Sequence, residues 1–368
     1  MILARAPYRL SFFGGGTDYP TWARREGGAV LSTTIDKYCH VTIRHLPPFF
    51  AHRHRVVWSH VEAVNEIGEI LHPAVREAMR MLDFEDDHGL EIHHQGDLPA
   101  RAGMGSSSSF AVSLIQGLSA YRGEMVAKQD LARMAIALEQ DRLGENVGSQ
   151  DQVAAAFGGL NKIEFRPDGD IRVVPLTLPA GRLEELEERI LLFFTGSSRL
   201  ASDVAAEVVA NLPSKEASLR RMREMVDEAV ALLASDRDLD EFGVAMDEAW
   251  KLKRGLATRV AGDTVNDVYR RARKAGALGG KLLGAGGSGF MAFYVPPRRQ
   301  EAVIRALGEF LHVPFRFETE GASIVHFGSR APEADVRTPT NLNARRPARS
   351  RVRSGNGTGR RTRASAAR

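Results

Sequence analysis

Cysteine is almost absent from the sequence: Cys39 is the one cysteine among 368 residues. A single cysteine excludes an intramolecular disulfide and is typical of proteins from a reducing compartment. The N-terminal segment, MILARAPYRL, lacks the apolar core of a signal peptide. No stretch approaches the roughly 18 consecutive apolar residues that a membrane span requires. These absences predict a cytoplasmic protein that does not cross a membrane.

Acidic residues are missing from the C-terminal end. Residues 337–368 contain ten arginines and no Asp or Glu. Without these ten, the 50 Lys and Arg fall to 40 against 46 Asp and Glu, so the net charge of +4 becomes about −6. The tail, rich in Arg, Ser, Gly, Pro and Ala, is expected to be disordered. It either contacts nucleic acid or another anionic surface, or is an extension without a role. We favour the second interpretation, so nucleic acid is not an expected partner.

Two common phosphate-binding motifs are also absent from a glycine- and serine-rich stretch at 98–118. No Gly-Lys-Ser/Thr follows its glycines, which excludes a Walker P-loop, and Ser108 stands where a G-x-G-x-x-G turn has its third glycine. Apolar residues recur every four positions after the serines, which predicts a helix starting there. Glycines allow close approach of a ligand, and a helix start offers free N–H groups. The stretch is therefore either a polyphosphate cradle or a turn that caps a core helix.

A second glycine-rich loop follows a strand expected over residues 2–13. The run Gly14-Gly15-Gly16-Thr17-Asp18 can wrap a small ligand, with Asp18 accepting hydrogen bonds from hydroxyl groups. Alternatively, it is a simple turn in which Asp18 caps the helix around Trp22.

Two acidic residues lie downstream of the serines. Glu139 follows the apolar stripe of a helix expected to start at Asp130. Asp151 lies in Ser149-Gln-Asp-Gln152, which has the form of a capping box. In the first turn of a helix the dipole favours the charged carboxylate, which can orient a hydroxyl group or accept its proton. The alternative is an ordinary acidic residue at a helix start.

Three features of the rest of the chain allow weaker predictions. The cluster from Trp250 to Arg254 either holds a substrate phosphate or, as we favour, is a solvated helix face. A glycine-rich loop, 279–289, separates a helix from a strand and implies a close approach of the backbone. Several histidines between His45 and His94 lack accompanying cysteine or carboxylate patterns, so we do not expect a metal site there.

Three of these segments, in this order along the chain, resemble the motifs of the GHMP small-molecule kinases. They are residues 6–19, the Pro-x-x-x-Gly-Met-Gly-Ser-Ser-Ser string at 99–108, and Lys-x-x-Gly-Ala-Gly at 281–286. The resemblance covers residues 1–328 and implies an α+β fold of two domains with the active site in the cleft between them. It implies an N-terminal β/α domain at 1–180 and a ferredoxin-like C-terminal domain at 181–328, and leaves 329–368 as the tail.

The resemblance also implies roles for individual residues, with ATP and Mg²⁺ as cofactors. Asp151 would take or orient the proton of the acceptor hydroxyl group, and Arg9 would stabilise the transferred phosphoryl group. The residues implied for binding are Gly103, Met104, Gly105, Ser106, Ser107, Ser108 and Ser109 for the nucleotide, Gly15, Gly16, Thr17, Asp18 and Gly286 for the substrate, and Ser107 (with Ser106 as runner-up) and Glu139 for the metal.

The first motif departs from the galactokinases at Gly15 and Gly16, where those enzymes carry Glu and His. This argues against galactose, and FGGGTDYP resembles the branch of the family that acts on heptose 7-phosphate. The implied reaction is phosphorylation of the anomeric hydroxyl group of D-glycero-D-manno-heptose 7-phosphate to the 1,7-bisphosphate, for synthesis of nucleotide-activated heptose. Other family members acting on fucose, a galactose-like sugar or an octose, and a non-catalytic sugar or ATP sensor, are alternatives. The sequence does not indicate an oligomeric state.

Overall fold

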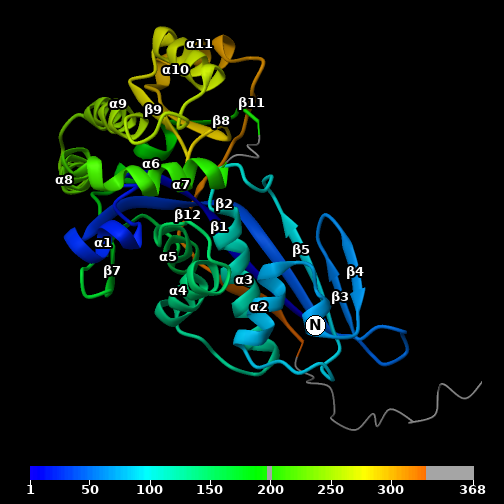
Figure 1. Ribbon diagram of the computed structural model, residues 1–368. Helices are drawn as coiled ribbons and strands as arrows, with labels where there is room; N and C mark the ends of the chain where they lie inside the picture. The colour runs from blue at the N-terminus through cyan, green and yellow to red at the C-terminus, as the bar shows by residue number, and fades with distance from the viewer. Residues whose placement is uncertain (197–200, 329–368) are drawn as a thin grey trace, which may run out of the picture. The chain divides into compact units, whose positions relative to one another are not determined.

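The computed structural model describes residues 1–196 and 201–328, all within one compact unit, Met1–Pro332 (Figure 1). The Arg-rich tail, predicted to be disordered, lies outside the described residues. Nine strands form sheet A, and four form sheet B. No helix of the described residues is long and apolar enough to cross a bilayer.

Sheet A is built around two long antiparallel strands that pair along most of their length, and its path runs β13-β1-β2-β5-β3-β4. The strands of sheet A are β1 (Ile2–Phe13), β2 (Gly28–His45), β3 (His54–Val57), β4 (Val61–Val64), β5 (Leu90–Gly96), β6 (Asn161–Phe165), β7 (Ile171–Pro175), β12 (Phe317–Glu318) and β13 (Ser323–Phe327). The strand predicted over 2–13 is confirmed as β1.

Helices gather on one face of sheet A (Figure 1). The helix predicted to start at the serines is α3, and it packs against β1 and β2. Phe110, Leu114 and Leu118, which carry the four-residue spacing, are all buried in the core. The helices of this layer are α2 (Pro73–Met81), α3 (Ser106–Tyr121), α4 (Lys128–Ile136), which runs into a π-helical turn (Ala137–Arg142), and α5 (Gln150–Phe157).

Sheet B has the strand order β11-β8-β10-β9, all antiparallel. The first strand, β8, is central and the second and fourth strands are at the edges, as in a ferredoxin-like arrangement. Its strands are β8 (Ile190–Phe194), β9 (Gly279–Leu282), β10 (Phe290–Tyr294) and β11 (Leu311–His312). The remaining helices are α1 (Pro20–Glu26), α6 (Arg182–Glu188), α7 (Ala201–Asn211), α8 (Glu216–Leu233), α9 (Asp240–Arg254), α10 (Asp263–Ala275) and α11 (Gln300–Ala306). Strands and helices are not strictly alternated, so the α+β class is confirmed.

The end of the described chain returns to sheet A. One strand was expected over 312–317, but this segment is divided between β11 of sheet B and β12 of sheet A. β13 then pairs with β1. The proposed domain limits at 180 and 328 remain predictions. The pairing of β12 and β13 means that sheet A draws strands from both ends of the described chain.

The predicted capping box at Ser149 is wrong. The Ser149 side chain makes no capping hydrogen bond to α5, and its hydroxyl group accepts one from Gln140 at 3.1 Å. The Gln152 side chain donates to Glu139 instead of turning back to Ser149. Tertiary partners thus replace the local ones.

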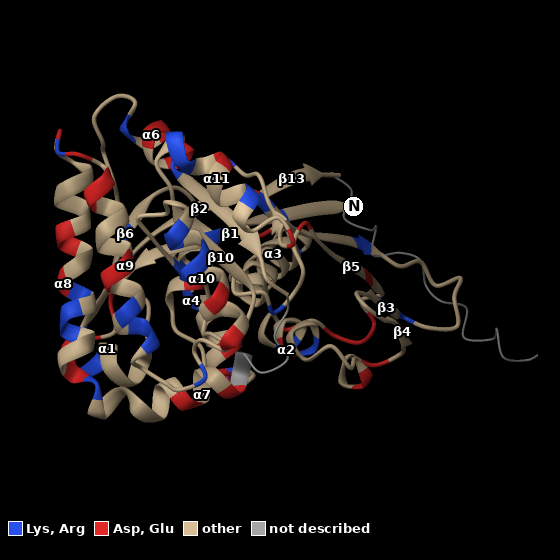
Figure 2. Cartoon of the chain, turned by 90° about the horizontal axis from the view of Figure 1, so that it is seen from above, with Lys and Arg blue, Asp and Glu red and all other residues tan. Residues whose placement is uncertain are grey.

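Charged residues of both signs are interspersed along the exposed helices (Figure 2). On α8, Arg220 pairs with Glu216, and Arg221 pairs with Glu228. The acidic and basic residues of this helix neutralise one another locally, so α8 presents no surface of one sign.

Candidate active site

A cavity of about 550 Å³ lies where the loop before α3, residues 101–105, meets residues from sheet B and α9. Its walls come from segments far apart in the sequence, including all three motif regions. The lining residues are Arg9, Ser11, Gly15, Gly16, Asp18, Tyr19, Arg101, Gly103, Gly105, Ser106, Ser107, Gly144 to Gly148, Gln150, Asp151, Ala205, Val208, Lys253, Leu256, Val260, Lys281, Leu283, Gly284 and Ala285.

The loop before α3 has the backbone geometry that its glycines predict. Gly103 and Gly105 have φ of 83° and 76°, in the left-handed region that favours glycine. Gly105 is the residue preceding α3, and Ser106 and Ser107 begin the helix at the cavity wall. The first N–H groups of a helix have no intrahelical acceptor. This cavity wall therefore carries a helix N-terminus suited to an anion.

The third motif lies directly against this loop. A Cβ on Gly103 would approach the Leu283 carbonyl oxygen to 2.4 Å, and one on Gly284 would approach Gly103 Cα to 2.5 Å. The N–H of Phe290 donates to the Ala102 carbonyl at 3.0 Å. The glycine-rich loop after β9 therefore permits the close approach that its composition implied.

Gly286 faces a different direction from the rest of this loop. A Cβ there would meet Val260 Cα at 2.8 Å and Val204 Cγ1 at 2.9 Å. Gly284 and Ala285 line the cavity, whereas Gly286 does not. Its role in substrate binding remains a prediction that these contacts do not support.

Arg9 and Asp151 form a two-pronged ion pair in the cavity. Arg9 Nε donates to Asp151 Oδ1 at 2.7 Å, and Nη2 donates to Oδ2 at 2.6 Å. Arg9 Nη1 also donates to the Gly103 carbonyl at 2.6 Å. A Cβ at Gly105 would lie 3.2 Å from Asp151 Oδ2, so the carboxylate borders the loop before α3. Residues 9, 103 and 151 thus meet at one point.

Asp18 is buried beside this pair and does not cap α1. Its Oδ1 accepts a hydrogen bond from the Gly16 N–H at 2.9 Å. Its Oδ2 accepts from the backbone and side-chain N–H groups of Gln150, at 3.3 and 3.1 Å. Burial raises the pKa of Asp18, and the nearby Asp151 charge adds to this effect, while the backbone donors oppose it. These donors fix the carboxylate where it borders the cavity with Gly15 and Gly16.

Glu139, in the π-helical turn Ala137–Arg142, is buried against the serines in the first turn of α3. Its Oε2 accepts hydrogen bonds from the Ser108 hydroxyl at 2.6 Å and from the Gln152 side chain. Its Oε1 is buried without a hydrogen-bond partner among the residues that the structure describes. Burial raises the pKa of Glu139 to about 7, although the hydroxyl groups of Ser108 and Ser107 lower it. An unpaired carboxylate oxygen beside hydroxyl groups matches the oxygen ligands of Mg²⁺.

Four side chains expected at the ligand turn inward. Met104 packs in the hydrophobic core, and Ser109 donates to the Pro7 carbonyl at 2.9 Å. The Thr17 hydroxyl group donates to the Gly14 and Ala29 carbonyls. The Ser108 hydroxyl group is occupied by Glu139. All four residues are buried and none lines the cavity, so their roles in ligand binding remain predictions that these contacts do not support.

Two lysines that the sequence analysis did not count among the site residues are buried at the cavity. Lys253 and Lys281 both line the cavity and are 8% and 4% exposed. The cluster at 250–254 was expected to be a solvated face, and for Lys253 this is wrong. One signal was available: Lys253 continues the inward stripe of Met246 and Trp250 at helical spacing.

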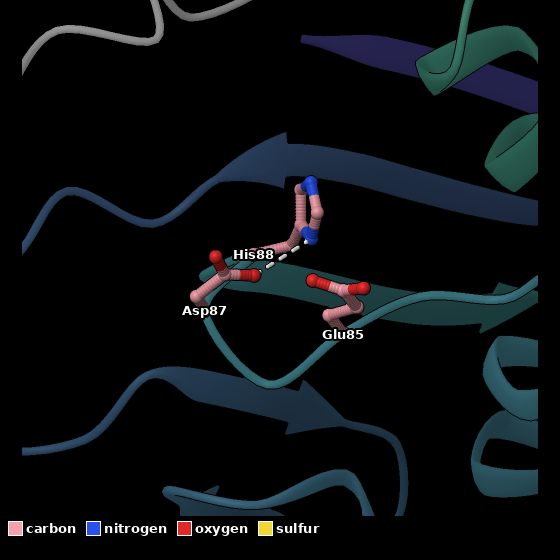
Figure 3. A group of neighbouring side chains, drawn as sticks. All are labelled: Glu85, Asp87 and His88. Atoms are coloured by element: carbon pink, nitrogen blue, oxygen red, sulfur yellow. Dashed lines mark ion pairs between the residues drawn. The ribbon is translucent and has the colours of Figure 1, made fainter.

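Away from the cavity, Glu85, Asp87 and His88 lie close enough to share a cation (Figure 3). All three are exposed, and Asp87 pairs with His88 at 3.0 Å. Nothing else in their surroundings points to a ligand. We assign no metal site to this group.

Comparisons with known proteins identify the family that this chain resembles. Residues 69–159 match the family model of the GHMP kinases N terminal domain, and residues 225–313 match that of the GHMP kinases C terminal. The chain is 29% identical over 317 residues to the D-glycero-alpha-D-manno-heptose 7-phosphate kinase of Campylobacter jejuni, which covers 83% of this chain and 93% of the relative.

Two further proteins are similar over most of this chain. The bifunctional fucokinase/GDP-fucose pyrophosphorylase of Arabidopsis thaliana is 28% identical over 312 residues, covering 77% of this chain but only 29% of that protein. The crystal structure of a D-glycero-D-manno-heptose 1-phosphate kinase from Bacteroides thetaiotaomicron has a TM-score of 0.74 at 25% identity, covering 89% of this chain and all of the other. Both family models, in family order and on the two halves of one fold, show that this chain belongs to the GHMP kinase family and is a phosphotransferase.

Proposed function

We propose that this kinase transfers the terminal phosphoryl group of ATP to a hydroxyl group of a sugar phosphate, D-glycero-D-manno-heptose 7-phosphate being the preferred acceptor. The similarity to the Campylobacter heptose 7-phosphate kinase over 83% of the chain supports this choice. The observation that carries the proposal is the convergence of two acidic residues on one loop. Asp151 Oδ2 lies 3.2 Å from the position that a Cβ on Gly105 would occupy, and Glu139 accepts a hydrogen bond from Ser108.

Phosphoryl transfer requires positioning and neutralisation of charge more than covalent chemistry. In our proposal the N–H groups at the start of α3, with the backbone of residues 103–109, bind the nucleotide phosphates. Asp151 accepts a hydrogen bond from the acceptor hydroxyl group and takes its proton as the new bond to phosphorus forms. Arg9 holds the Asp151 carboxylate through two hydrogen bonds, and its remaining N–H groups face the transferred group.

Asp18 is proposed to hold the sugar. Its carboxylate is fixed by Gly16 and Gln150, so its free lone pairs are oriented before the sugar arrives. Gly15 and Gly16 have no side chains, which leaves space beside it for a larger sugar than galactose. Preorganised acceptors of this kind select for hydroxyl geometry.

Ser107 and Glu139 are the residues we propose to hold Mg²⁺. The buried, unpaired Oε1 of Glu139 and the adjacent hydroxyl groups fit a hard cation with oxygen ligands. Mg²⁺ would neutralise negative charge on the nucleotide phosphates. The Glu139 carboxylate accepts a hydrogen bond from Ser108 in the first turn of α3, which supports its choice as a ligand.

A second acceptor class is an unphosphorylated sugar such as fucose, which the similarity to the Arabidopsis fucokinase supports.

We place the reaction in the cytoplasm. This proposal rests on the low cysteine content, Cys39 being the single cysteine of the sequence, which is typical of proteins from a reducing compartment.

The test combines a substrate panel with one substitution. ATP consumption is measured with heptose 7-phosphate, heptose, fucose and galactose, and product is identified by mass and by its anomeric phosphate signal in ³¹P NMR. We expect kcat/KM to be highest with heptose 7-phosphate; a higher value with fucose would select the second class. Asp151→Asn should lower kcat by about 10² or more while an ATP analogue still binds. Activity within a few-fold of the wild type would refute the role of Asp151.

A further inference from the structure

Lys253 is buried in the cavity without an acidic partner. It lies on α9, and its side chain reaches the cavity although only 8% of the residue is exposed. Its Nζ donates to the Leu282 carbonyl at 2.8 Å and to the Gly284 carbonyl. Among residues 1–196 and 201–328, no carboxylate lies within ion-pair distance of this nitrogen. Burying a cation without a counter-charge is costly.

A second lysine lies in the same wall. Lys281 is also buried, and its Nζ donates to the Phe12 carbonyl at 2.9 Å. Within the described part of the chain it, too, forms no ion pair with an acidic group. An ammonium group has three donors, and the hydrogen bonds above use two on Lys253 and one on Lys281. Donors therefore remain on both groups at the cavity.

The other charged groups of the cavity do not compensate these lysines. Arg9 and Asp151 neutralise each other through their paired hydrogen bonds. Asp18 already accepts three N–H donors, and among the described residues it forms no salt bridge with a lysine. With the Arg9–Asp151 pair neutral, the remaining charged residues that line the cavity are three basic ones, Lys253, Lys281 and Arg101, and two acidic ones, Asp18 and Glu145. The cavity is short of negative charge.

Electrostatics agrees with this picture. Burial lowers the pKa of Lys253 to about 7, and the positive charge of Arg9 lowers it further, while Asp151 and Asp18 raise it. Burial and the charge on Lys253 lower the pKa of Lys281 well below its usual range. An anion that enters the cavity would restore the charged form of each ammonium group.

We propose that Lys253, with Lys281 beside it, is an anion subsite that binds phosphoryl oxygens on the cavity wall formed by α9 and β9. This inference rests on the proposed function. The phosphoryl group comes from one of two sources, the terminal phosphate of ATP or the phosphate that the acceptor sugar already carries. Lys253 belongs to α9 and is held by the loop after β9, so the subsite joins the sheet B half of the molecule to the ligand.

The test uses Lys253→Met, which keeps the length of the side chain and removes its charge. Lys251→Met is the matched control: it lies on the same helix, its side chain is 69% exposed, and it pairs with Asp247 outside the cavity. Calorimetric titrations with a non-hydrolysable ATP analogue, and separately with heptose 7-phosphate and heptose, give the affinity for each source. We expect Lys253→Met to weaken one phosphorylated ligand at least ten-fold and Lys251→Met to change none more than two-fold.

The two arms separate the sources. A loss confined to the ATP analogue assigns the subsite to the terminal phosphate, and a loss confined to heptose 7-phosphate, with heptose unaffected, assigns it to the acceptor. Affinities for both within two-fold of the wild type in a folded Lys253→Met protein would overturn the proposal. Failure to turn over any sugar would refute the proposed function instead, since the ATP-analogue arm does not require an acceptor.

A second measurement does not depend on a folded variant. At pH 8, anion binding to the wild-type protein should take up protons, approaching about one per bound ligand if Lys253 recovers its charge. Titrations in two buffers of different ionisation enthalpy measure this uptake. No uptake with either phosphorylated ligand would overturn the proposal even if Lys253→Met did not fold.

Discussion

Removing one partner of the Arg9–Asp151 ion pair should cost more stability than removing the second one afterwards. The Arg9 side chain is 4% exposed and that of Asp151 is 22% exposed. Two charge-assisted hydrogen bonds join them, at 2.7 and 2.6 Å. Breaking a buried pair by removing one partner typically costs about 3–5 kcal/mol. Because Asp151 borders the cavity and water can reach it, we expect about 2–3 kcal/mol for Asp151→Asn.

The reason is the charge left behind. Asp151→Asn replaces one of the two carboxylate oxygens that accept hydrogen bonds from Arg9 with an NH₂ group, so two donors face each other there. The buried Arg9 charge also loses its counter-ion. In Arg9→Met the remaining carboxylate can be hydrated from the cavity, so we expect a smaller loss of about 1–2 kcal/mol. In the double variant no charge is stranded. Its stability should be close to that of Arg9→Met, so the coupling free energy should equal the cost of Asp151→Asn, about 2–3 kcal/mol.

The assay is urea unfolding of the four proteins without ligand, followed by circular dichroism, with m-values compared to check for two-state behaviour. The control is the exposed pair of Arg166 and Asp170, 3.9 Å apart and about half exposed on each side. Its cycle should give less than about 0.5 kcal/mol. A coupling below that same value for Arg9 and Asp151 would refute the claim that each residue offsets the buried charge of the other.

Two further predictions concern the residues proposed to hold the acceptor and the metal. A Cβ on Gly148 would lie 1.9 Å from Asp18 Oδ2, so Gly148→Ala should displace this carboxylate. Steady-state kinetics should then show the KM of the acceptor raised at least ten-fold. Calorimetry should show the affinity for the ATP analogue within two-fold of the wild type. Glu139 has a pKa of about 7 in the folded protein against 4.5 when exposed. Between these two values the folded state holds a proton on Glu139 that the unfolded state has lost. The stabilisation from this proton is therefore lost as pH rises from about 5 to 8. In Mg²⁺-free urea unfolding, Glu139→Gln should remove about 2–3 kcal/mol of that pH dependence.

The controls for these predictions are available in the chain. Gly262 has an ordinary backbone conformation, and no atom lies within 4 Å of the point that its Cβ would occupy, so Gly262→Ala should leave both ligands unaffected. Unchanged acceptor KM in Gly148→Ala would contradict the role of Asp18. For Glu139, equal pH dependence in the wild type and in Glu139→Gln would show that the carboxyl group is not buried in its neutral form.

Local patterns in the sequence predicted the elements that carry most of the site. The spacing of Phe110, Leu114 and Leu118 predicted α3, because a helix with one buried face repeats every three to four residues. The two glycines before it predicted the left-handed turn. Such features depend on residues close in the chain, so they can be read without the fold. Where a local signal competed with a tertiary partner, as at Ser149, the prediction failed.

Partners distant in the chain were beyond the reach of these patterns. Lys253 is a charged residue on an inward helical position, and charged residues in helices are usually solvated. Only the packing of α9 against β9 makes it a cavity residue. The ion pair of Arg9 and Asp151 joins residues 142 positions apart, and no local rule specifies it.

The sequence alone therefore determined the family motifs, the α+β class, and which acids and glycines are the candidates for the chemistry. The tertiary structure decided which of those side chains reach the cavity, how Arg9 and Asp151 neutralise each other, and that two lysines remain without a counter-charge among the described residues. The physical reason is that secondary structure follows from interactions over a few residues, whereas electrostatic balance in a cavity is a sum over groups that only the completed fold brings together.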